Sequence, residues 1–407
     1  MSDGGPGSRA WRDAARERLL TFARRSVREE GGFVWLENDG EPDPDRDLEL
    51  WINARMTYVF ALAHLGSDPT KGDGEYLRLA THGVHAITTL FHDDEFGGWF
   101  AQVDVDGHPV GHDKFCYEHA FVLLAACAAS AAGADGADAL LTEATDIHER
   151  RFWDVSTGRC VEQRSRDWLT ADGYRGANSN MHTVEAYLFA ADATGNPIWR
   201  DRARSICERI IGIHARAHEW RVPEHYDSDW TPIPYYNEDE PADPFRPFGV
   251  TPGHAFEWAR LLLQLAASLD DPRPWMEEAA EALFDRAVED AVSDEFPGIP
   301  YTTDWHGVPV VDERFHWVMA EAVLAASALH RYTGAARYEG LAQRWWSEID
   351  DHFIDPTTGS WHHELSPSLG PSSRTWHGKP DAYHAYNALT FPDLPLAPTA
   401  ALTIRPA

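Results

Sequence analysis

Two kinds of helical segment alternate along the chain, and they differ in where their hydrophobic residues fall. The first kind is rich in small and apolar residues on all sides, which is typical of helices buried in a protein interior. It covers 48–65, 114–130, 178–195, 251–269, 312–330 and 379–390. The second kind is charged, with an apolar stripe on one side, as expected for an outer layer. It covers 75–91, 197–217, 274–292 and 338–353.

Short stretches with strand character lie between these helices. The stretches "FHDDEFGGWF" at 91–100, "FWDVSTGRCVEQ" at 152–163 and "FIDPTTGSWHHEL" at 353–365 each combine an aromatic residue, acidic residues and a glycine turn. Degenerate copies occupy 219–230 and 294–307. Turns of this type followed by alternating residues predict loops or short hairpins between helices.

The six apolar helices share a polar residue near their first turns. Aligning them there gives Arg55, His119, His182, His254, His316 and His384. Successive members are 64, 63, 72, 62 and 68 residues apart. A repeat of this length is one helix pair, which cannot bury its apolar faces alone and must stack on others. We therefore predict that residues 1–407 form one all-α domain, an (α/α)6 barrel with short β-hairpins in its loops and these polar residues at one mouth.

Charge and composition narrow the partners of such a barrel. The formal net charge is −31, which argues against nucleic acid and anionic membrane surfaces because both repel an acidic body. The 17 tryptophans and 13 tyrosines lie in part outside the predicted helix cores. They can anchor packing, or they can present apolar faces to a sugar ring.

The cysteines and the first residues bear on the compartment. None of Cys116, Cys127, Cys160 and Cys207 forms a C-x-x-C pair, so we expect buried free thiols in a reducing environment. The opening "MSDGGPGSRAWRDAARERLL" has no apolar core of a secretory signal, and no apolar run reaches the length of a membrane span. We expect a cytoplasmic monomer or homodimer, in which Trp345 and Trp346 either pack inward or form a dimer face.

Histidine–carboxylate pairs are the clearest candidate chemistry. "HTVE" (His182, Glu185) and "HAFE" (His254, Glu257) place a carboxylate one helical turn after a histidine. Such a carboxylate can accept the imidazole N–H, fix its tautomer and raise its basicity, although a simple surface pair has the same spacing. The recurrence in two apolar helices favours the tuned pair, and several histidines at one mouth favour proton transfer.

Two other kinds of site use similar residues. A di-metal site on helices needs E-x-x-H on paired helices, whereas the order here is H-x-x-E. A glycoside hydrolase needs two carboxylates beside the scissile bond, and Glu118, Glu257 and Glu321 are available. The chain contains no G-x-S-x-G, P-loop or G-x-G-x-x-G fingerprint, so acyl transfer and nucleotide or dinucleotide binding are unsupported.

Four stretches of the sequence resemble a known family. "TPGHAFEWARLLL", "NSNMHTVEA" and "GKPDAYHAYNA" are similar to motifs of the N-acylglucosamine 2-epimerase superfamily, and "ELWINARMTYVFAL" resembles its aldose–ketose isomerase branch. The resemblance extends from about Trp11 to Leu389. It implies an (α/α)6 barrel, a monosaccharide substrate, and chemistry that needs neither a metal nor an organic cofactor.

The resemblance also implies roles for individual residues. Two catalytic histidines match His254 and His384, and supporting positions match Arg55, His182 and Glu257. Sugar-contacting or pocket-lining positions match Asn178, Trp51, Tyr117, Trp317 and Glu321. One histidine opens the sugar ring, and the other removes the C2 proton to give a cis-enediolate and returns it to C1. We expect His384 to be this base, His254 the ring-opening group oriented by Glu257, and Arg55 the stabiliser of the enediolate oxygens; the two histidines could exchange roles.

Several functions remain open from the sequence. The first is interconversion of D-mannose and D-fructose. A sulfoquinovose isomerase would use the same parts with an extra cation for the sulfonate, for which Arg246, Arg314 and Lys379 are candidates. A sugar 2-epimerase, a glycoside hydrolase on the same barrel and a non-catalytic sugar-binding ring are the others. We also expect two acidic, proline-rich segments, "PADPFRPFG" at 241–249 and the loop around 235–243, to form a lid over the mouth.

Overall fold

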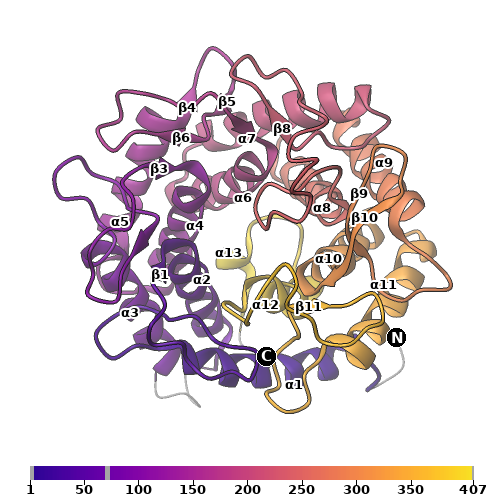
Figure 1. Cartoon of the computed structure of the whole chain (residues 1–407), viewed down its shortest axis with the longest axis horizontal. Helices are drawn as coiled ribbons and strands as arrows, with labels where there is room; N and C mark the ends of the chain where they lie inside the picture. Colours follow the sequence, from indigo (N-terminus) through magenta and orange to yellow (C-terminus); the bar gives the residue numbers. More distant parts are fainter. Residues whose placement is uncertain (1–3, 69–73, 406–407) are drawn as a thin grey trace.

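Two concentric rings of helices make up the protein in a computed structural model that describes residues 4–68 and 74–405 (Figure 1). The inner ring consists of α2 (Leu50–Gly66), α4 (Cys116–Ala132), α6 (Ala177–Thr194), α8 (Pro252–Ser268), α10 (His316–Thr333) and α12 (Tyr383–Thr390). The outer ring consists of α1 (Arg9–Ala23), α3 (Glu75–Thr89), α5 (Ala137–Ile147), α7 (Ile198–Cys207), α9 (Pro274–Ala291) and α11 (Ala336–Glu348). A short helix, α13 (Ala400–Thr403), follows. This arrangement is the predicted (α/α)6 barrel.

The burial of each helix follows its hydrophobic pattern. In α2 every residue from Leu50 to Ala63 is buried, whereas α3 buries only a stripe that includes Ala80, Val84 and Ile87. The prediction of buried inner and one-sided outer helices is confirmed. The predicted segments 312–330 and 379–390 begin too early, because 312–315 belong to a strand and 379–382 precede α12. The outer helices α1 and α5 were not among those predicted.

Short antiparallel strands join the units at one end of the barrel. The pairs are β1 (Leu48–Glu49) with β2 (Gln102–Val103), β3 (Lys114–Phe115) with β6 (Gln163–Arg164), β4 (Trp153–Asp154) with β5 (Arg159–Cys160), and β7 (Arg175–Gly176) with β8 (His225–Tyr226). The strand β10 (Pro309–Phe315) lies between β9 (Pro300–Thr303) and β11 (Glu364–Leu365). The glycine-turn stretches predicted short hairpins, and β4–β5 and β9–β10 are hairpins, while single bridges from His92 to Trp99 and from Ile354 to Trp361 close two further turns. The pairs β1–β2, β3–β6, β7–β8 and β10–β11 instead join strands of different units.

Six equivalent backbone hydrogen bonds close the ring at this end. Just before or at the start of each inner helix, one amide donates to a carbonyl in the hairpin of the next unit. The bonds are Leu50 to Ala101, Cys116 to Glu162, Ala177 to Glu224, Val250 to Thr303, His316 to His363 and Lys379 to Leu36. The last of them joins the final unit to the first, so the hydrogen-bonding pattern is continuous around the barrel.

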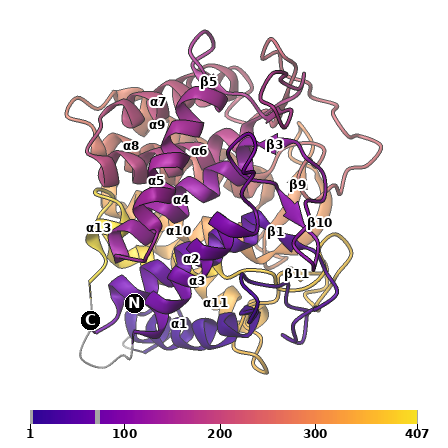
Figure 2. The same cartoon turned by 90° about the vertical axis from the view of Figure 1, so that its left-hand side faces the viewer.

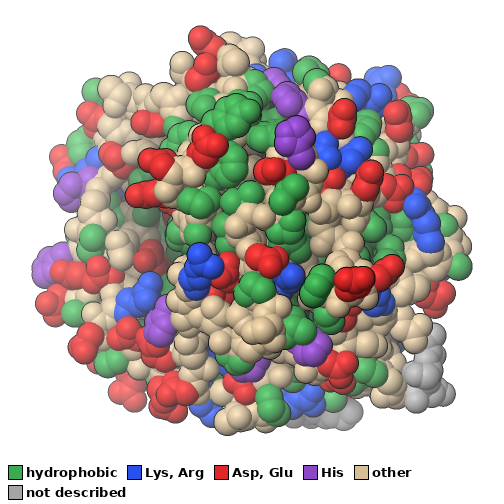
Figure 3. All heavy atoms as spheres, turned by 45° about the vertical axis from the view of Figure 1, so that its right-hand side comes forward, with side chains coloured by type: hydrophobic (Ala, Val, Ile, Leu, Met, Phe, Trp, Pro, Cys, Tyr) green, Lys and Arg blue, Asp and Glu red, His purple; other side chains and the backbone are tan. Residues whose placement is uncertain are grey.

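The two ends of the barrel differ. In the side view, the strands gather at one end, while α13 and both chain ends lie toward the other (Figure 2). Acidic side chains are spread over the surface seen in Figure 3, in agreement with the net charge of −31. Within the described residues, no helix has both the length and the apolar character needed to cross a membrane.

The core confirms two predictions about individual residues. All four cysteines are buried and free, as expected. Trp345 and Trp346 are buried and pack inward, so they cannot form a dimer face. One hydrophobic cluster runs from α1 to α13, which supports the prediction of a single domain.

Candidate active site

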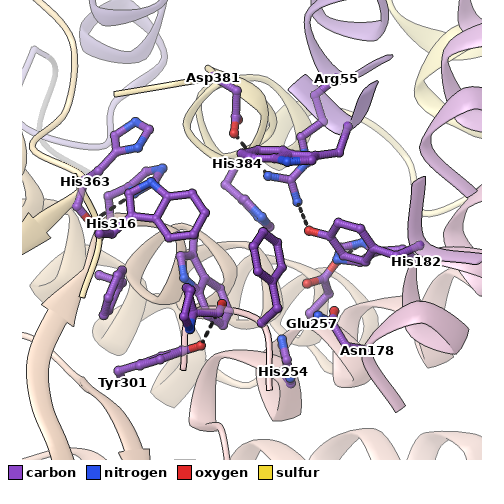
Figure 4. Close-up of a pocket in the computed structure, with 17 residues that line it drawn as sticks. Arg55, Asn178, His182, His254, Glu257, Tyr301, His316, His363, Asp381 and His384 are labelled. Carbon is purple, nitrogen blue, oxygen red and sulfur yellow. Dashed lines mark hydrogen bonds and ion pairs between the residues drawn. The ribbon is translucent and has the colours of Figure 1, made fainter. Parts of the chain in front are cut away.

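A pocket opens at the strand end of the barrel, between the first turns of the inner helices (Figure 4). Its aromatic and aliphatic lining consists of Trp51, Tyr117, Pro244, Phe245, Tyr301, Phe315, Trp317 and Trp376. Its polar lining consists of Arg55, Asn178, His182, His254, Glu257, His316, His363, Asp381 and His384. A polar floor between aromatic walls suits a small ligand with many hydroxyls and an apolar face.

Arg55 is the fixed positive charge of this pocket. Its guanidinium donates to the Asp381 carboxylate at 3.1 Å and to the Tyr117 hydroxyl at 3.0 Å, and it lies 4.3 Å from the centre of the Phe121 ring. Burial is the largest influence on Asp381 and opposes its ionisation, but Arg55 and the groups around it together outweigh burial and lower the pKa of Asp381. The Arg55–Asp381 pair is therefore ionised, and Arg55 is held rigidly against the pocket (Figure 4).

His254 faces the pocket from the first turn of α8. Its Nδ1 lies 2.9 Å from Oε1 of Glu224, which is 4% exposed and precedes β8. Because a carboxylate oxygen accepts hydrogen bonds, this contact assigns the proton to Nδ1 and leaves the Nε2 lone pair for a ligand. His254 is thus set up to exchange protons through Nε2.

His384 on α12 has the same kind of partner. Its Nδ1 lies 2.9 Å from Oε1 of Glu321, which is fully buried on α10. The Trp317 ring contacts both imidazoles, with centroids 5.2 Å from His254 and 5.7 Å from His384. Burial, and then the positive charge of Arg55, lower the pKa of His384 well below its usual value. His384 is therefore neutral near pH 7, which is the state required of a base.

Below His182 lies a buried cluster of charges. Nδ1 of His182 is 3.7 Å from Oε1 of Glu257, and burial followed by Arg55 lowers the pKa of His182 well below its usual value. Burial raises the pKa of Glu257 well above its usual value. Arg260, one turn further along α8, contacts Glu257 at 3.3 Å and Glu321 at 3.1 Å.

The structure corrects the predicted histidine–carboxylate pairs. The partner of His254 is Glu224, not Glu257, and the partner of His182 is Glu257, not Glu185. Residues three apart on a helix were expected to pair, but the side chains that meet come from different elements. Glu224 was missed, although its carbonyl occupies the same place in the ring of backbone hydrogen bonds as that of Glu162. The equivalent positions of Glu224 and Glu162 in the repeat were the one signal that could have pointed to Glu224.

The register of the repeat also differs from the predicted alignment. Arg55, His182, Glu321 and His384 each follow the ring-forming amide of their unit by five positions. In this register the equivalent residue in α4 is Phe121 rather than His119, and the equivalent residue in α10 is Glu321 rather than His316. His119 does not line the pocket; its Nε2 accepts from the Trp99 amide and its Nδ1 bonds the Phe115 carbonyl. His316 does line it and stacks on His363 at 3.8 Å.

Nine of the eleven predicted site residues line the pocket: Arg55, His182, His254, Glu257, His384, Trp51, Tyr117, Asn178 and Trp317. Glu321 lies behind His384 rather than in the lining. Arg246 lies in an adjoining cleft with its guanidinium 4.1 Å from the Tyr174 ring centre. Among the pocket-lining residues not predicted, Asp381 fixes Arg55, and Trp376 and Phe245 contact Trp51.

The segment before α8 covers part of the pocket. Pro244 and Phe245 line it, and the Phe245 ring contacts Trp51, Tyr117 and Trp376 with centroids 5.7–6.3 Å away. Pro244 and Phe245 both belong to the 241–249 stretch of the predicted lid, so this part of it lines the pocket. Its movement stays a prediction.

Two groups of side chains in the described residues have the spacing of metal ligands. They are His182 with Glu185 and Glu257, and Glu257 with Glu321 and His384. The guanidinium of Arg260 already contacts all three carboxylates, at 3.1–3.3 Å. A metal cation placed among them would be repelled by this buried charge. The donor sets therefore do not favour a metal.

Comparisons with known proteins agree on one family. The family described as N-acylglucosamine 2-epimerase (GlcNAc 2-epimerase) matches residues 31–388. A D-mannose isomerase of Thermobifida fusca is 47% identical over 395 residues, which are 97% of this chain and 96% of that protein. A D-mannose isomerase of Pseudomonas cannabina pv. alisalensis is 44% identical over 402 residues, 97% and 95% of the two chains. A crystal structure of a D-mannose isomerase matches with a TM-score of 0.87 and 31% identity, over 95% of this chain and 98% of that one.

Proposed function

The chain belongs to the N-acylglucosamine 2-epimerase family, and we propose that it is an aldose–ketose isomerase that interconverts D-mannose and D-fructose. One observation carries the proposal: His254 and His384 face one pocket, each with Nδ1 fixed by a buried carboxylate and Arg55 beside them. Isomerisation of an aldose needs two positioned proton carriers and a cation near the sugar oxygens. The identity to two D-mannose isomerases supports the choice of sugar.

Ring opening is the first chemical step, and we assign it to His254. Its Nε2 accepts the proton of the anomeric hydroxyl and delivers a proton to the ring oxygen as the C1–O5 bond breaks. The product is the open-chain aldehyde with no net change of charge. Glu224 keeps the proton on Nδ1 and stabilises the imidazolium that forms in between.

Proton transfer between C2 and C1 follows, and we assign it to His384. Its neutral Nε2 removes the C2 proton, and the electron pair moves to give a cis-enediolate with negative charge on oxygen. The hydroxyl proton of O2 passes to O1, and the same imidazolium returns its proton to C1, which leaves a ketone at C2 and a hydroxyl at C1. Arg55, fixed by Asp381 and Tyr117, stabilises the enediolate oxygens because a preorganised cation acts where charge develops.

The charges at the pocket support mannose over sulfoquinovose. A sulfonate needs a cation in addition to Arg55, and Arg55 is the one arginine or lysine that lines the pocket in the described part of the chain. Arg314 is bonded to Asp312 and Lys379 to Asp355. Arg246 stacks on Tyr174 in the adjoining cleft. All three candidates for sulfonate binding are thus held elsewhere.

The carboxylates of the site argue against a glycoside hydrolase. The acidic residues in the pocket lining are Glu257 and Asp381. Asp381 forms an ion pair with Arg55, and Glu257 is bonded to Arg260 beneath the pocket. Neither is placed like a pair of free carboxyls on either side of a glycosidic oxygen.

Identification of the product tests the proposed function. Purified protein is incubated with D-mannose in the presence of EDTA, and the sugars are followed by NMR. We expect fructose to accumulate without any added metal. Glucose as the main product would show a 2-epimerase instead, and the absence of any product from mannose, with turnover of sulfoquinovose, would overturn the choice of substrate.

A further inference from the structure

We propose that Arg260 is a positioning residue of the isomerase: by clamping three buried carboxylates behind the pocket, it fixes Glu321 and thereby the tautomer and orientation of His384. The inference rests on the proposed function, because it concerns the base of that reaction. Arg260 does not line the sugar pocket. It is 2% exposed and lies on α8, six residues after His254.

The contacts of Arg260 reach three inner helices. Its Nε donates to Glu321 on α10 at 3.1 Å, its Nη1 to Glu185 on α6 at 3.3 Å, and its Nη2 to Glu257 on its own helix at 3.3 Å. Nη1 also donates to Gln264, one turn further along α8, at 3.2 Å. Only the planar fork of an arginine can satisfy acceptors in so many directions at once.

Each clamped carboxylate contacts a group at the pocket floor. The second oxygen of Glu321 bonds His384, and that of Glu185 accepts from the hydroxyl of Tyr383, the neighbour of His384 in the chain. Glu257 faces His182 at 3.7 Å. One guanidinium therefore positions three carboxylates. Two of them bond Tyr383 and His384 on α12, and the third faces His182 on α6.

Charge explains why the clamp is needed. Burial raises the pKa of Glu185 and of Glu321, and the charge of Arg260 is the largest influence that opposes the rise. Without it, three carboxylates would crowd one buried space, and Glu321 would take up a proton. A protonated Glu321 no longer requires a hydrogen at Nδ1 of His384, so the lone pair could move away from the pocket.

His384 is surrounded by several charged or titratable groups, so its behaviour depends on all of them. The groups that face it or act on it are Arg55 on α2, His182 on α6, Arg260 and Glu257 on α8, Glu321 and His316 on α10, His363 before β11, and Asp381 next to its own helix. Of these, Arg55, His316 and Arg260 disfavour its imidazolium. When Arg260 is removed and Glu321 takes up a proton, the negative charge 2.9 Å from Nδ1 of His384 is lost, so the pKa of His384 should fall further.

The main test replaces Arg260 by glutamine. We expect kcat to fall at least about tenfold, KM to change less than about threefold because Arg260 does not touch the sugar, and the acidic limb of the kcat profile to move to lower pH. Arg260→Lys keeps the positive charge but cannot contact three carboxylates at once. Its pH profile should therefore resemble that of the wild type, while its kcat should stay low. The matched control is Arg221→Gln, which breaks a buried bidentate pair with Asp290 and should leave the pH profile unchanged.

A second readout is independent of turnover. The imidazole nitrogen shifts of His384, identified by their loss in His384→Gln, report its pKa and tautomer in the wild type and in Arg260→Gln. We expect a lower pKa and loss of the Nδ1–H form in the variant. If the wild type shows no isomerase activity, the proposed function fails, while this titration still decides the inference.

The structure offers a way to restore the missing group. A cavity at the opposite end of the barrel reaches Arg260 and is bounded by Phe189, Gln264, Arg331 and the segment 391–400. In Arg260→Ala, methylguanidinium can enter from there without passing through the sugar pocket, and it should restore part of kcat.

If Arg260→Gln alone does not fold, the charge-balanced pair Arg260→Gln with Glu185→Gln replaces it. A folded variant with wild-type kcat, pH profile and His384 titration would overturn the inference.

Discussion

The pairing of Glu224 with His254 gives the sharpest prediction of the mechanism. We consider Glu224→Gln, which keeps the shape of the side chain but removes its charge. The 2.9 Å contact to Nδ1 is a hydrogen bond to a carboxylate, a class that contributes about 1.5–3 kcal/mol. The charge matters most when His254 becomes an imidazolium during ring opening. At about 1.4 kcal/mol for each factor of ten, kcat/KM for D-mannose should fall about 10- to 150-fold.

The assay follows fructose formation from D-mannose and, separately, measures the binding of an open-chain analogue that cannot close or react. The loss in Glu224→Gln should appear in turnover of mannose, while the analogue should still bind. Glu162→Gln is the matched control, because the Glu162 carbonyl occupies the equivalent place in the backbone ring but its side chain bonds Ser179 rather than a histidine. If Glu224→Gln retains kcat/KM within about twofold of the wild type, the assigned role of Glu224 is wrong.

Three further predictions follow from the site. Arg55→Lys should lower kcat about 100-fold or more, because one fixed donor at a developing oxyanion contributes this much; steady-state kinetics at saturating mannose measure it. Since burial and Arg55 lower the pKa of His384, the base stays neutral and kcat should hold below pH 6.5, and a pH–rate profile whose acidic limb begins above 6.5 would contradict this. The free energy of unfolding should fall as the pH drops below 6.5, because the unfolded chain then binds protons that buried His384 and His182 do not; denaturant titrations at several pH values test the sign.

The barrel was predictable because its cause lies in local pattern. Six helices buried on all sides alternate with one-sided helices, and that alternation alone indicates two concentric layers. The register of the repeat, that is, which residues of the six inner helices are equivalent, was harder to predict from the sequence. It is set by backbone bonds between units, such as that from Lys379 to Leu36, which join residues far apart in sequence. Aligning polar residues instead gave His119 the position in the repeat that Phe121 in fact occupies.

The position of His254 and His384 in the pocket was predictable, but their partners were not. Sequence spacing can suggest only partners on the same helix, as for His254 and Glu257. The carboxylates that hold the imidazoles come from other units: Glu224 lies 30 residues before His254, and Glu321 lies 63 residues before His384. Such pairs depend on how the ring closes, so they required the structure.

Isomerisation of unlabelled D-mannose in deuterium oxide tests the central claim most directly, since that claim is proton transfer by His384 through an enediolate. Fructose is isolated early in the reaction and its C1 hydrogens are examined by NMR. We predict deuterium at C1 in part of the fructose, because the proton on Nε2 can exchange with solvent before it returns. Fructose formed with no deuterium at C1 at any stage, together with undiminished turnover in His384→Gln, would indicate direct hydride transfer and contradict the account.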